Sequence, residues 1–129
     1  MVHFKQNDMA ESHDFGAEAE DFAARYLVSR GYCILHRNWR YGHKELDIVC
    51  TDGRVLVVAE VKARVQGGFS PPEDLLSVAK ERLILEASEH YLYQYQVRLP
   101  VRFDLLAVIR KGTKMDLEHL EDAILPGVE

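Results

Sequence analysis

The dipeptide Asp52-Gly53 stands between two runs of apolar, largely β-branched residues, and it constrains the fold more than any other feature of the sequence. The flanking runs are ELDIVC at 45–50 and VLVVAEVK at 55–62. Asp-Gly between such runs is a strong signal for a β-hairpin with a two-residue turn. The sequence therefore predicts two adjacent antiparallel strands joined at this turn.

The two-residue turn fixes a register that gathers charged side chains on one face. It pairs Asp47 with Val58 and Glu45 with Glu60, and opposed residues share a face. Glu45, Asp47, Glu60 and Lys62 should then project from the same side of the hairpin. A cluster of buried carboxylates is costly unless a cation neutralises it, so a bound metal ion is one interpretation. The alternative is an exposed hairpin face that carries ordinary surface charges.

The residue types in this cluster indicate which metal it would bind. Carboxylate oxygens without His or Cys favour Mg²⁺ or Mn²⁺ over Zn²⁺. Such an ion can orient a phosphate, lower the pKa of an attacking water and stabilise the charge that develops on the phosphoryl oxygens. Lys62, two residues beyond Glu60, could position or activate that water.

The remaining segments predict an α/β domain. An amphipathic helix is expected from Ala19 to Leu27 with a stop at Gly31, followed by a strand at 32–36 and a polar connection at 38–44. A loop at 66–72 should lead into a helix from about Glu73 to Tyr93, and 101–109 should form an interior strand before a weakly patterned C-terminal segment. The stripe expected to face the core on the second helix is Leu76, Ala79, Leu83, Ala87 and Tyr91.

Composition limits the class of protein. The 129 residues are 47% hydrophobic and 29% charged, which suits one globular domain over 1–129, with a core at about 15–110 and a flexible segment at 1–13. No stretch is apolar enough to span a membrane and no secretory signal is evident, so we expect a cytoplasmic protein. Cys33 and Cys50 lack metal-ligand spacing and are expected to be buried free thiols.

The net charge of −5 argues against a protein that coats nucleic acid non-specifically, but a local basic groove remains compatible with it. Arg40, Lys44, Arg64 and Lys80 are the candidates for contacts with phosphate groups. Each of them could equally form an ordinary surface salt bridge.

Several short motifs, taken together and in order, resemble the YraN-like bacterial proteins of the restriction-endonuclease-like, PD-(D/E)XK superfamily. They cover roughly residues 15 to 110. The motifs are Gly16-x-x-x-Glu20, Gly31-Tyr32, Arg37-Asn38-x-Arg40, Glu45-Leu46-Asp47-Ile48-Val49, Glu60-Val61-Lys62-x-Arg64, Lys80 and Arg102-Phe103-Asp104. Two positions depart from the family pattern: Lys44 stands where a glycine is usual, and Ala63 where a hydroxyl residue is common.

This resemblance implies a mixed four-stranded sheet flanked by helices, similar to archaeal Holliday-junction resolvases. It further implies that Asp47, Glu60 and Glu20 are metal ligands within a catalytic site, with Lys62 as the catalytic lysine. Related resolvases often act as dimers, which makes a homodimer an expectation here.

Two classes of function follow from these features. The first is a Mg²⁺-dependent nuclease that acts on DNA, with branched or repair intermediates as candidate substrates by analogy with the resolvases. The second is a catalytically silent nucleic-acid-binding module, or a subunit of a complex, that keeps the nuclease scaffold. A purely structural protein would be a third, and its carboxylates would show no affinity for metal.

Overall fold

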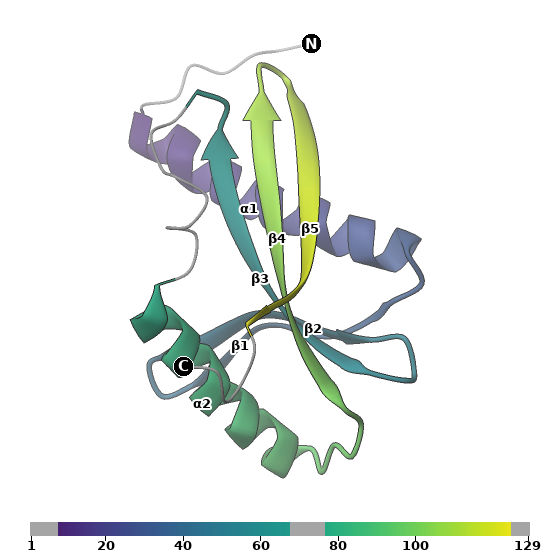
Figure 1. Ribbon diagram of the computed structural model, residues 1–129. Helices are drawn as coiled ribbons and strands as arrows, with labels where there is room; N and C mark the ends of the chain where they lie inside the picture. Colours follow the sequence, from purple (N-terminus) through teal and green to yellow (C-terminus); the bar gives the residue numbers. More distant parts are fainter. Residues whose placement is uncertain (1–7, 68–76, 125–129) are drawn as a thin grey trace.

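The computed structural model of the chain describes residues 8–67 and 77–124, with side chains from Phe15 onward. It is an α/β structure in which two helices flank one mixed sheet (Figure 1). The elements, in chain order, are α1 (Asp8–Ser29), β1 (Cys33–Tyr41), β2 (Lys44–Thr51), β3 (Leu56–Val65), α2 (Val78–Gln94), β4 (Val101–Lys111) and β5 (Lys114–Ile124).

The sheet has five strands in the order β1-β2-β3-β4-β5, and only β3 and β4 are parallel to each other. The predicted α/β class is confirmed, but the predicted number of four strands is wrong. The additional strand is β5, which the sequence presents only as a weak pattern. It is an edge strand with Lys114, Asp116 and Glu118 exposed, and such charges are common on edges, where they dilute the hydrophobic signal.

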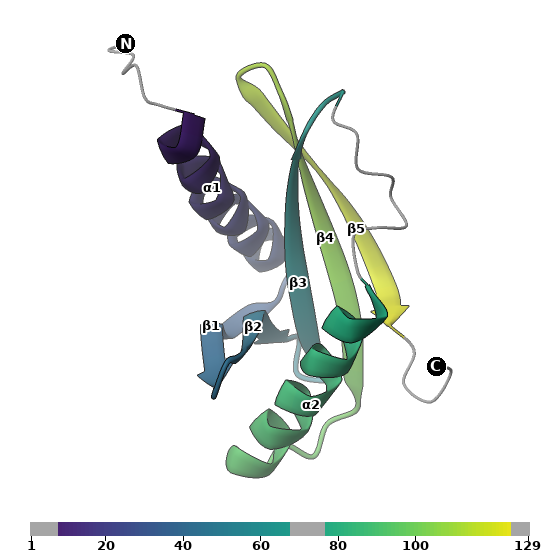
Figure 2. The ribbon, with the colours of Figure 1, turned by 90° about the vertical axis from the view of Figure 1, so that its left-hand side faces the viewer.

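The two helices cover opposite faces of the sheet, because alternate residues of β3 pack against different helices. Val57 and Ala59 belong to a core cluster with α1, whereas Leu56 and Val58 belong to a second cluster with α2. Figure 1 shows α1 passing behind β3, β4 and β5, and Figure 2 shows α2 beside the β1–β2 hairpin. Each face of β3 is therefore buried, as its apolar sequence requires.

The β2–β3 hairpin forms, but its predicted register is wrong by two residues. Thr51 pairs with Leu56, and the ladder ends at Ile48 and Ala59. The loop holds four residues because Oδ1 of Asp52 accepts the N–H groups of both Arg54 and Val55, at 2.8 and 3.1 Å. A shift of two residues leaves each side chain on its original face, so the expected clustering of charges does not depend on the error.

The first strand is longer than expected, since β1 runs to Tyr41 and pairs with β2 where a polar connection at 38–44 was predicted. Its burial pattern explains the difference. Only Trp39 is buried among the nine residues, so this edge strand lacks a continuous apolar signal. Cys33 lies at the exposed start of β1, which contradicts the expected burial of that thiol, whereas Cys50 is buried; both are free.

At Asn38 and Asp47 the β1–β2 hairpin twists, so that side chains before and after this point, which would share a face in a regular strand, pack against different helices. The residues on either side of Asn38 pair with Leu46 and Ile48, which places Asn38 opposite Asp47. Ile48 packs in the α1 cluster and Leu46 in the α2 cluster, although alternate residues of a regular strand share a face. Asn38 has φ of 54°, in the left-handed region that asparagine tolerates better than most residues.

The helices follow their sequence patterns only in part. Ala19, Ala23 and Leu27 are fully buried in α1, as predicted, and the helix begins at Asp8, so it includes part of the segment expected to be flexible. The predicted start of the second helix near Glu73 and its residue Leu76 lie outside the described residues. Ser77 caps α2.

The buried face of α2 is turned from the predicted stripe. Ile84, Ala87 and Tyr91 are buried, whereas Ala79 and Leu83 are exposed. Of the four predicted positions that the structure describes, Ala87 and Tyr91 therefore face the core. The helix carries few strongly apolar residues, so its pattern alone did not fix the angle at which it meets the β1–β2 hairpin.

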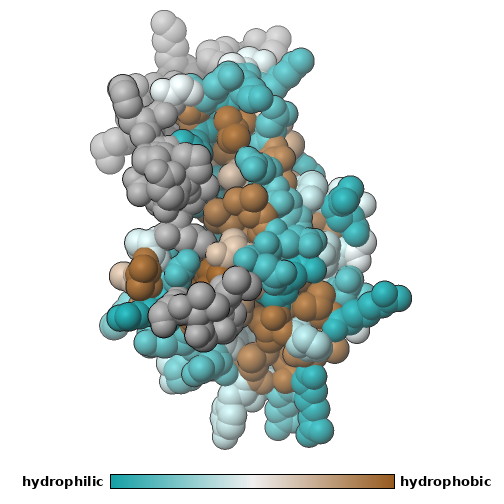
Figure 3. All heavy atoms as spheres, in the orientation of Figure 1, coloured by the Kyte–Doolittle hydropathy of each residue, from teal (hydrophilic) through white to brown (hydrophobic). Residues whose placement is uncertain are grey.

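On the face seen in Figure 3, hydrophobic side chains lie in patches among hydrophilic ones, which is ordinary for a globular domain. Across the described helices, none combines the length and the apolar character that a membrane crossing requires.

The left-handed backbone at Asn38 leads to a test of the fold. Asn38→Ala should lower the free energy of unfolding more than Asn38→Gly, because alanine in this region costs roughly 1–2 kcal/mol and glycine does not. Both variants lose the hydrogen bond from Asn38 to Glu20, so the comparison isolates the backbone. We expect a difference of roughly 0.5–1 kcal/mol by urea denaturation, and equal stabilities would contradict the proposed role of the left-handed turn.

Candidate active site

The carboxylates of Asp47 and Glu60 each accept a backbone N–H from the opposite strand at the point where β2 separates from β3. The N–H of Val61 donates to Oδ2 of Asp47 at 2.9 Å, and the N–H of Asp47 donates to Oε2 of Glu60 at 3.1 Å. Both bonds begin just beyond the last ladder pair, Ile48 with Ala59. The backbone groups released by the separating strands thus orient the two carboxylates.

The electrostatic environment of this pair disfavours its full ionisation. Burial raises the pKa of Glu60 to about 8, and the negative charge of Asp47 adds to the rise. Burial likewise raises the pKa of Asp47, with Glu20 and Glu45 contributing, while the N–H of Val61 and the charge of Lys80 oppose the rise. Near neutral pH the pair therefore tends to retain a proton, which a metal ion could replace.

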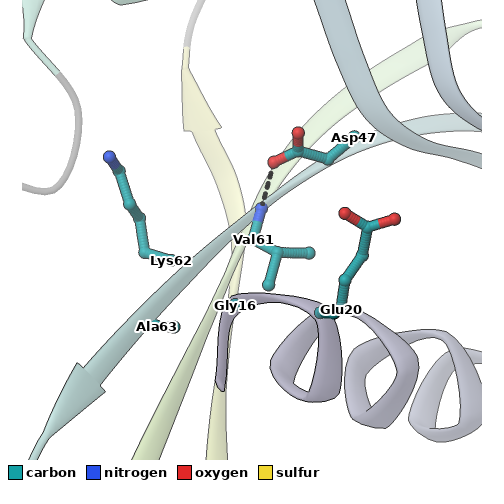
Figure 4. Close-up of a pocket in the computed structure, with 7 residues that line it drawn as sticks. Gly16, Glu20, Asp47, Val61, Lys62 and Ala63 are labelled. Atoms are coloured by element: carbon teal, nitrogen blue, oxygen red, sulfur yellow. Dashed lines mark hydrogen bonds between the residues drawn. The ribbon is translucent and has the colours of Figure 1, made fainter. Parts of the chain in front are cut away.

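Helix α1 brings Glu20 to the same place. Asp47 and Glu20 line an open cavity of about 540 Å³, in which the Glu20 side chain extends toward Asp47 while the Asp47 carboxylate turns toward the N–H of Val61 (Figure 4). The other residues of its wall are Gly16, Ala17, Val61, Lys62 and Ala63. The predicted approach of Glu20 to the hairpin carboxylates is therefore present in the structure.

Two residues of β1 orient Glu20. Its Oε1 accepts hydrogen bonds from Nδ2 of Asn38 at 2.8 Å and from Nη2 of Arg37 at 3.1 Å. Arg37 also bonds Asp21 at 2.7 Å, which ties it to α1. The Arg37-Asn38 motif stands out in the sequence, but no role in orienting Glu20 was predicted for it. That role depends on the left-handed backbone at Asn38, which asparagine tolerates but does not by itself specify.

Lys62 and Glu60 lie on the same side of β3, because alternate residues share a face and the ladder with β4 is regular from Leu56 to Val65. Glu60 is almost fully buried on the side of α2, where Oε1 lies 3.9 Å from Nζ of Lys80. Lys62 borders the cavity, but its ammonium extends away from Asp47 and Glu20 in Figure 4. Glu60 and Lys62 thus share a face as expected, whereas Asp47 lines the cavity beside α1.

The basic residues named for phosphate contacts mostly face carboxylates. Arg40 bonds Glu45 at 3.1 Å, and Lys44 bonds Glu86 of α2 at 2.9 Å. Arg64 is half-buried on β3, two residues beyond Lys62. These pairs are partly exposed, so their net energies are small and a phosphate could exchange with the carboxylates.

The cluster of Glu20, Asp47 and Glu60 offers only carboxylate oxygens, and one oxygen of each is already held by an N–H group. Its excess negative charge and raised pKa values fit a hard divalent cation such as Mg²⁺ or Mn²⁺. Among the described residues these three carboxylates are not close enough for one oxygen of each to lie within 4.8 Å of the others, so all three could share one ion only after their side chains move.

A different group, Asp104, His119 and Glu121, does have ligand atoms within 4.8 Å of one another. Here Arg102 donates to both carboxylate oxygens of Asp104, at 2.9 and 2.8 Å, and His119 approaches the same carboxylate at 2.7 Å. A guanidinium stays charged and would repel a metal ion at this position. We interpret the group as an ion-pair network between β4 and β5.

The sequence matches the Uncharacterised protein family UPF0102 over residues 19–108, the segment that contains Glu20, Asp47, Glu60 and Lys62. The chain belongs to the UPF0102 family. This confirms the predicted YraN-like membership, and the five-stranded sheet with its flanking helices is consistent with a restriction-endonuclease-like fold.

UPF0102 relatives align with nearly the whole chain. The UPF0102 protein of Phocaeicola vulgatus is 44% identical over 120 residues, covering 93% of this chain and 99% of the relative. That of Porphyromonas gingivalis strain ATCC 33277 is 42% identical and covers 89% and 87%. That of Flavobacterium psychrophilum is 36% identical and covers 89% and 97%. These proteins carry the family name alone, so they define the family but not a reaction.

The raised pKa of Glu60 makes stability depend on pH. A carboxyl that holds its proton more tightly when folded stabilises the protein below its unfolded value of 4.5, and this contribution is lost as pH rises through about 8. We expect the free energy of unfolding of Glu60→Gln to fall less over this range than that of the wild type, by an amount on the order of a few kcal/mol.

Chemical denaturation at several pH values measures this difference. Glu118→Gln, on the exposed side of β5, is the matched control and should keep the wild-type pH profile. A wild-type profile in Glu60→Gln would show that Glu60 does not titrate in this range.

Proposed function

We propose that this UPF0102 protein is a Mg²⁺- or Mn²⁺-dependent nuclease that hydrolyses phosphodiester bonds in DNA. The observation that carries the proposal is the position of Asp47. It lines an open cavity together with Glu20, and its backbone N–H donates a hydrogen bond to Oε2 of Glu60. Among the described residues, ion pairs reach Glu20, Glu45 and Glu60, but none reaches Asp47. A divalent cation is the natural partner for this remaining charge.

The protein supplies a preorganised set of ligands. The N–H groups of Val61 and Asp47 fix the carboxylates of Asp47 and Glu60 before any ion binds, and Asn38 and Arg37 do the same for Glu20. Groups that are already oriented lose little freedom when the reaction begins. A bound ion would orient a phosphate and lower the pKa of an attacking water.

Lys62 is the candidate for the second catalytic charge. It lines the cavity that holds Asp47, so its ammonium can reach a phosphate that enters there. In this role it would position the attacking water or offset negative charge on the phosphoryl oxygens. Arg40, Lys44, Arg64 and Lys80 would contact the DNA backbone, three of them in exchange for a carboxylate partner.

Two observations favour a second candidate, a nucleic-acid-binding module without turnover. The ammonium of Lys62 points away from the carboxylates, and Glu60 faces α2 instead of lining the cavity. A scaffold that keeps these residues for stability alone would have the same arrangement. Metal binding and cleavage distinguish the two candidates.

Metal should stabilise the folded protein. A ligand that binds only the native state at ten times its Kd adds about 1.4 kcal/mol, so Mn²⁺ or Mg²⁺ should raise the melting temperature. Asp47→Asn should remove this response, while Asp116→Asn, at the exposed β4–β5 hairpin, should keep it. Melting that ignores both ions in the wild type would count against a metal site.

Cleavage is the direct test. Linear, nicked, flapped and four-way DNA substrates, incubated with Mg²⁺ and Mn²⁺, should reveal metal-dependent hydrolysis that Asp47→Ala abolishes. Lys62→Ala should reduce single-turnover cleavage by at least about tenfold while changing DNA affinity little, because its charge acts mainly in the transition state. If the wild type binds these substrates but cleaves none of them, the non-catalytic candidate is preferred.

A further inference from the structure

Lys80 approaches the acidic centre from the first turn of α2. Its Nζ lies 3.9 Å from Oε1 of Glu60, whose side chain is 3% exposed, whereas 42% of the Lys80 side chain is exposed. The helix cap fixes the start of this lysine, because Oγ of Ser77 accepts the backbone N–H of Lys80 at 3.1 Å. A mobile, solvated ammonium is thus held at the edge of a buried carboxylate.

The contact is electrostatic and leaves the ammonium free to move. At 3.9 Å the two atoms are too far apart for a strong hydrogen bond. The other oxygen of Glu60 is held by the N–H of Asp47, so Oε1 is the oxygen that faces the lysine. Within the described part of the chain, Lys80 is the cation that forms an ion pair with Glu60, and its charge also favours the ionised form of Asp47.

We propose that Lys80 is a positioning residue that serves as the counter-ion of Glu60 when this carboxylate is ionised and no metal is bound, and that a divalent ion at the acidic cluster displaces its ammonium. This inference rests on the proposed function, since it requires that Glu60 can hold a metal. It assigns to Lys80 a role beyond the phosphate contact that the sequence suggests.

A bound divalent ion should displace the Lys80 ammonium for two reasons, the repulsion between the two cations and the solvent exposure of the lysine side chain. A dication bound at Glu60 and an ammonium beside the same oxygen repel each other strongly where water is largely excluded. The long side chain of Lys80 can turn into solvent at little cost, whereas Glu60 is fixed by burial and by its backbone bond. Lys80 therefore competes with the metal, and once displaced it is available to a phosphate at the same edge of the site.

The experiment compares apparent Mg²⁺ affinities, taken from the Mg²⁺ dependence of the melting temperature at about pH 8.5, above the pKa of Glu60. Lys80→Met should bind Mg²⁺ about three- to tenfold more tightly than the wild type, and Lys80→Arg should stay close to the wild type. Lys111→Met is the matched control. Lys111 is similarly exposed and pairs with Asp116 at the β4–β5 hairpin, so its loss should leave the affinity unchanged.

A double-mutant cycle in the absence of metal, at the same pH of about 8.5, tests the counter-ion role by itself. Lys80→Met should lower the melting temperature in the wild type but not in Glu60→Gln, where the amide needs no counter-ion. The same cycle on Lys111 and Asp116 gives the coupling of an ordinary surface pair, which should be smaller.

The outcomes separate this inference from the proposed function. If the wild type responds to Mg²⁺ and Lys80→Met binds it equally or more weakly, the competition is refuted while the metal site stands. If no variant responds to Mg²⁺, the metal site fails and with it the displacement. Absence of coupling between Lys80 and Glu60 in the cycle overturns the counter-ion role in either case.

Discussion

The separation of β2 from β3 at Asp47 is the constraint on which the rest of the site depends. A backbone N–H that leaves a ladder must find another acceptor, because an unpaired buried amide is costly. Here the N–H groups of Asp47 and Val61 donate to the carboxylates of Glu60 and Asp47. The end of the ladder therefore also orients the acidic side chains. The left-handed Asn38 lies opposite Asp47 and turns the hairpin, so that α2 can pack against its far half.

The same arrangement accounts for the electrostatics. Strands that diverge inside the sheet bury Glu60 and half-bury Asp47, while α1 adds Glu20 from the opposite side. Neighbouring cations offset this charge only in part, since Arg37 divides its guanidinium between Glu20 and Asp21, and Lys80 lies 3.9 Å from Glu60. Carboxylates buried close together raise the energy of the folded state, and such local cost is common where a protein binds a ligand or performs chemistry.

Asp47 and Glu60 could be identified from the sequence although the predicted register of their hairpin was wrong. Asp47 and Glu60 stand out as charges inside runs of Leu, Ile and Val, and that conflict with burial is visible in any register. The register itself was wrong by two residues, because the side chain of Asp52 closes a longer loop than Asp-Gly usually does. β5 was not predicted because an exposed edge strand needs few apolar residues. The buried face of α2 was predicted wrongly because the apolar stripe of this helix is weak.

By itself the sequence determined the α/β class, the central hairpin, the buried face of α1 and the family, since each follows from local periodicity, from turn chemistry or from ordered motifs. Only the tertiary structure decided which charges meet. It placed Lys80 against Glu60 and turned Lys62 away, and it gave Glu20 to Asn38 and Arg37. The physical reason is that these contacts join residues 17 to 20 positions apart in the chain, so they depend on how the strands twist and where the helices dock, and no local pattern encodes that geometry.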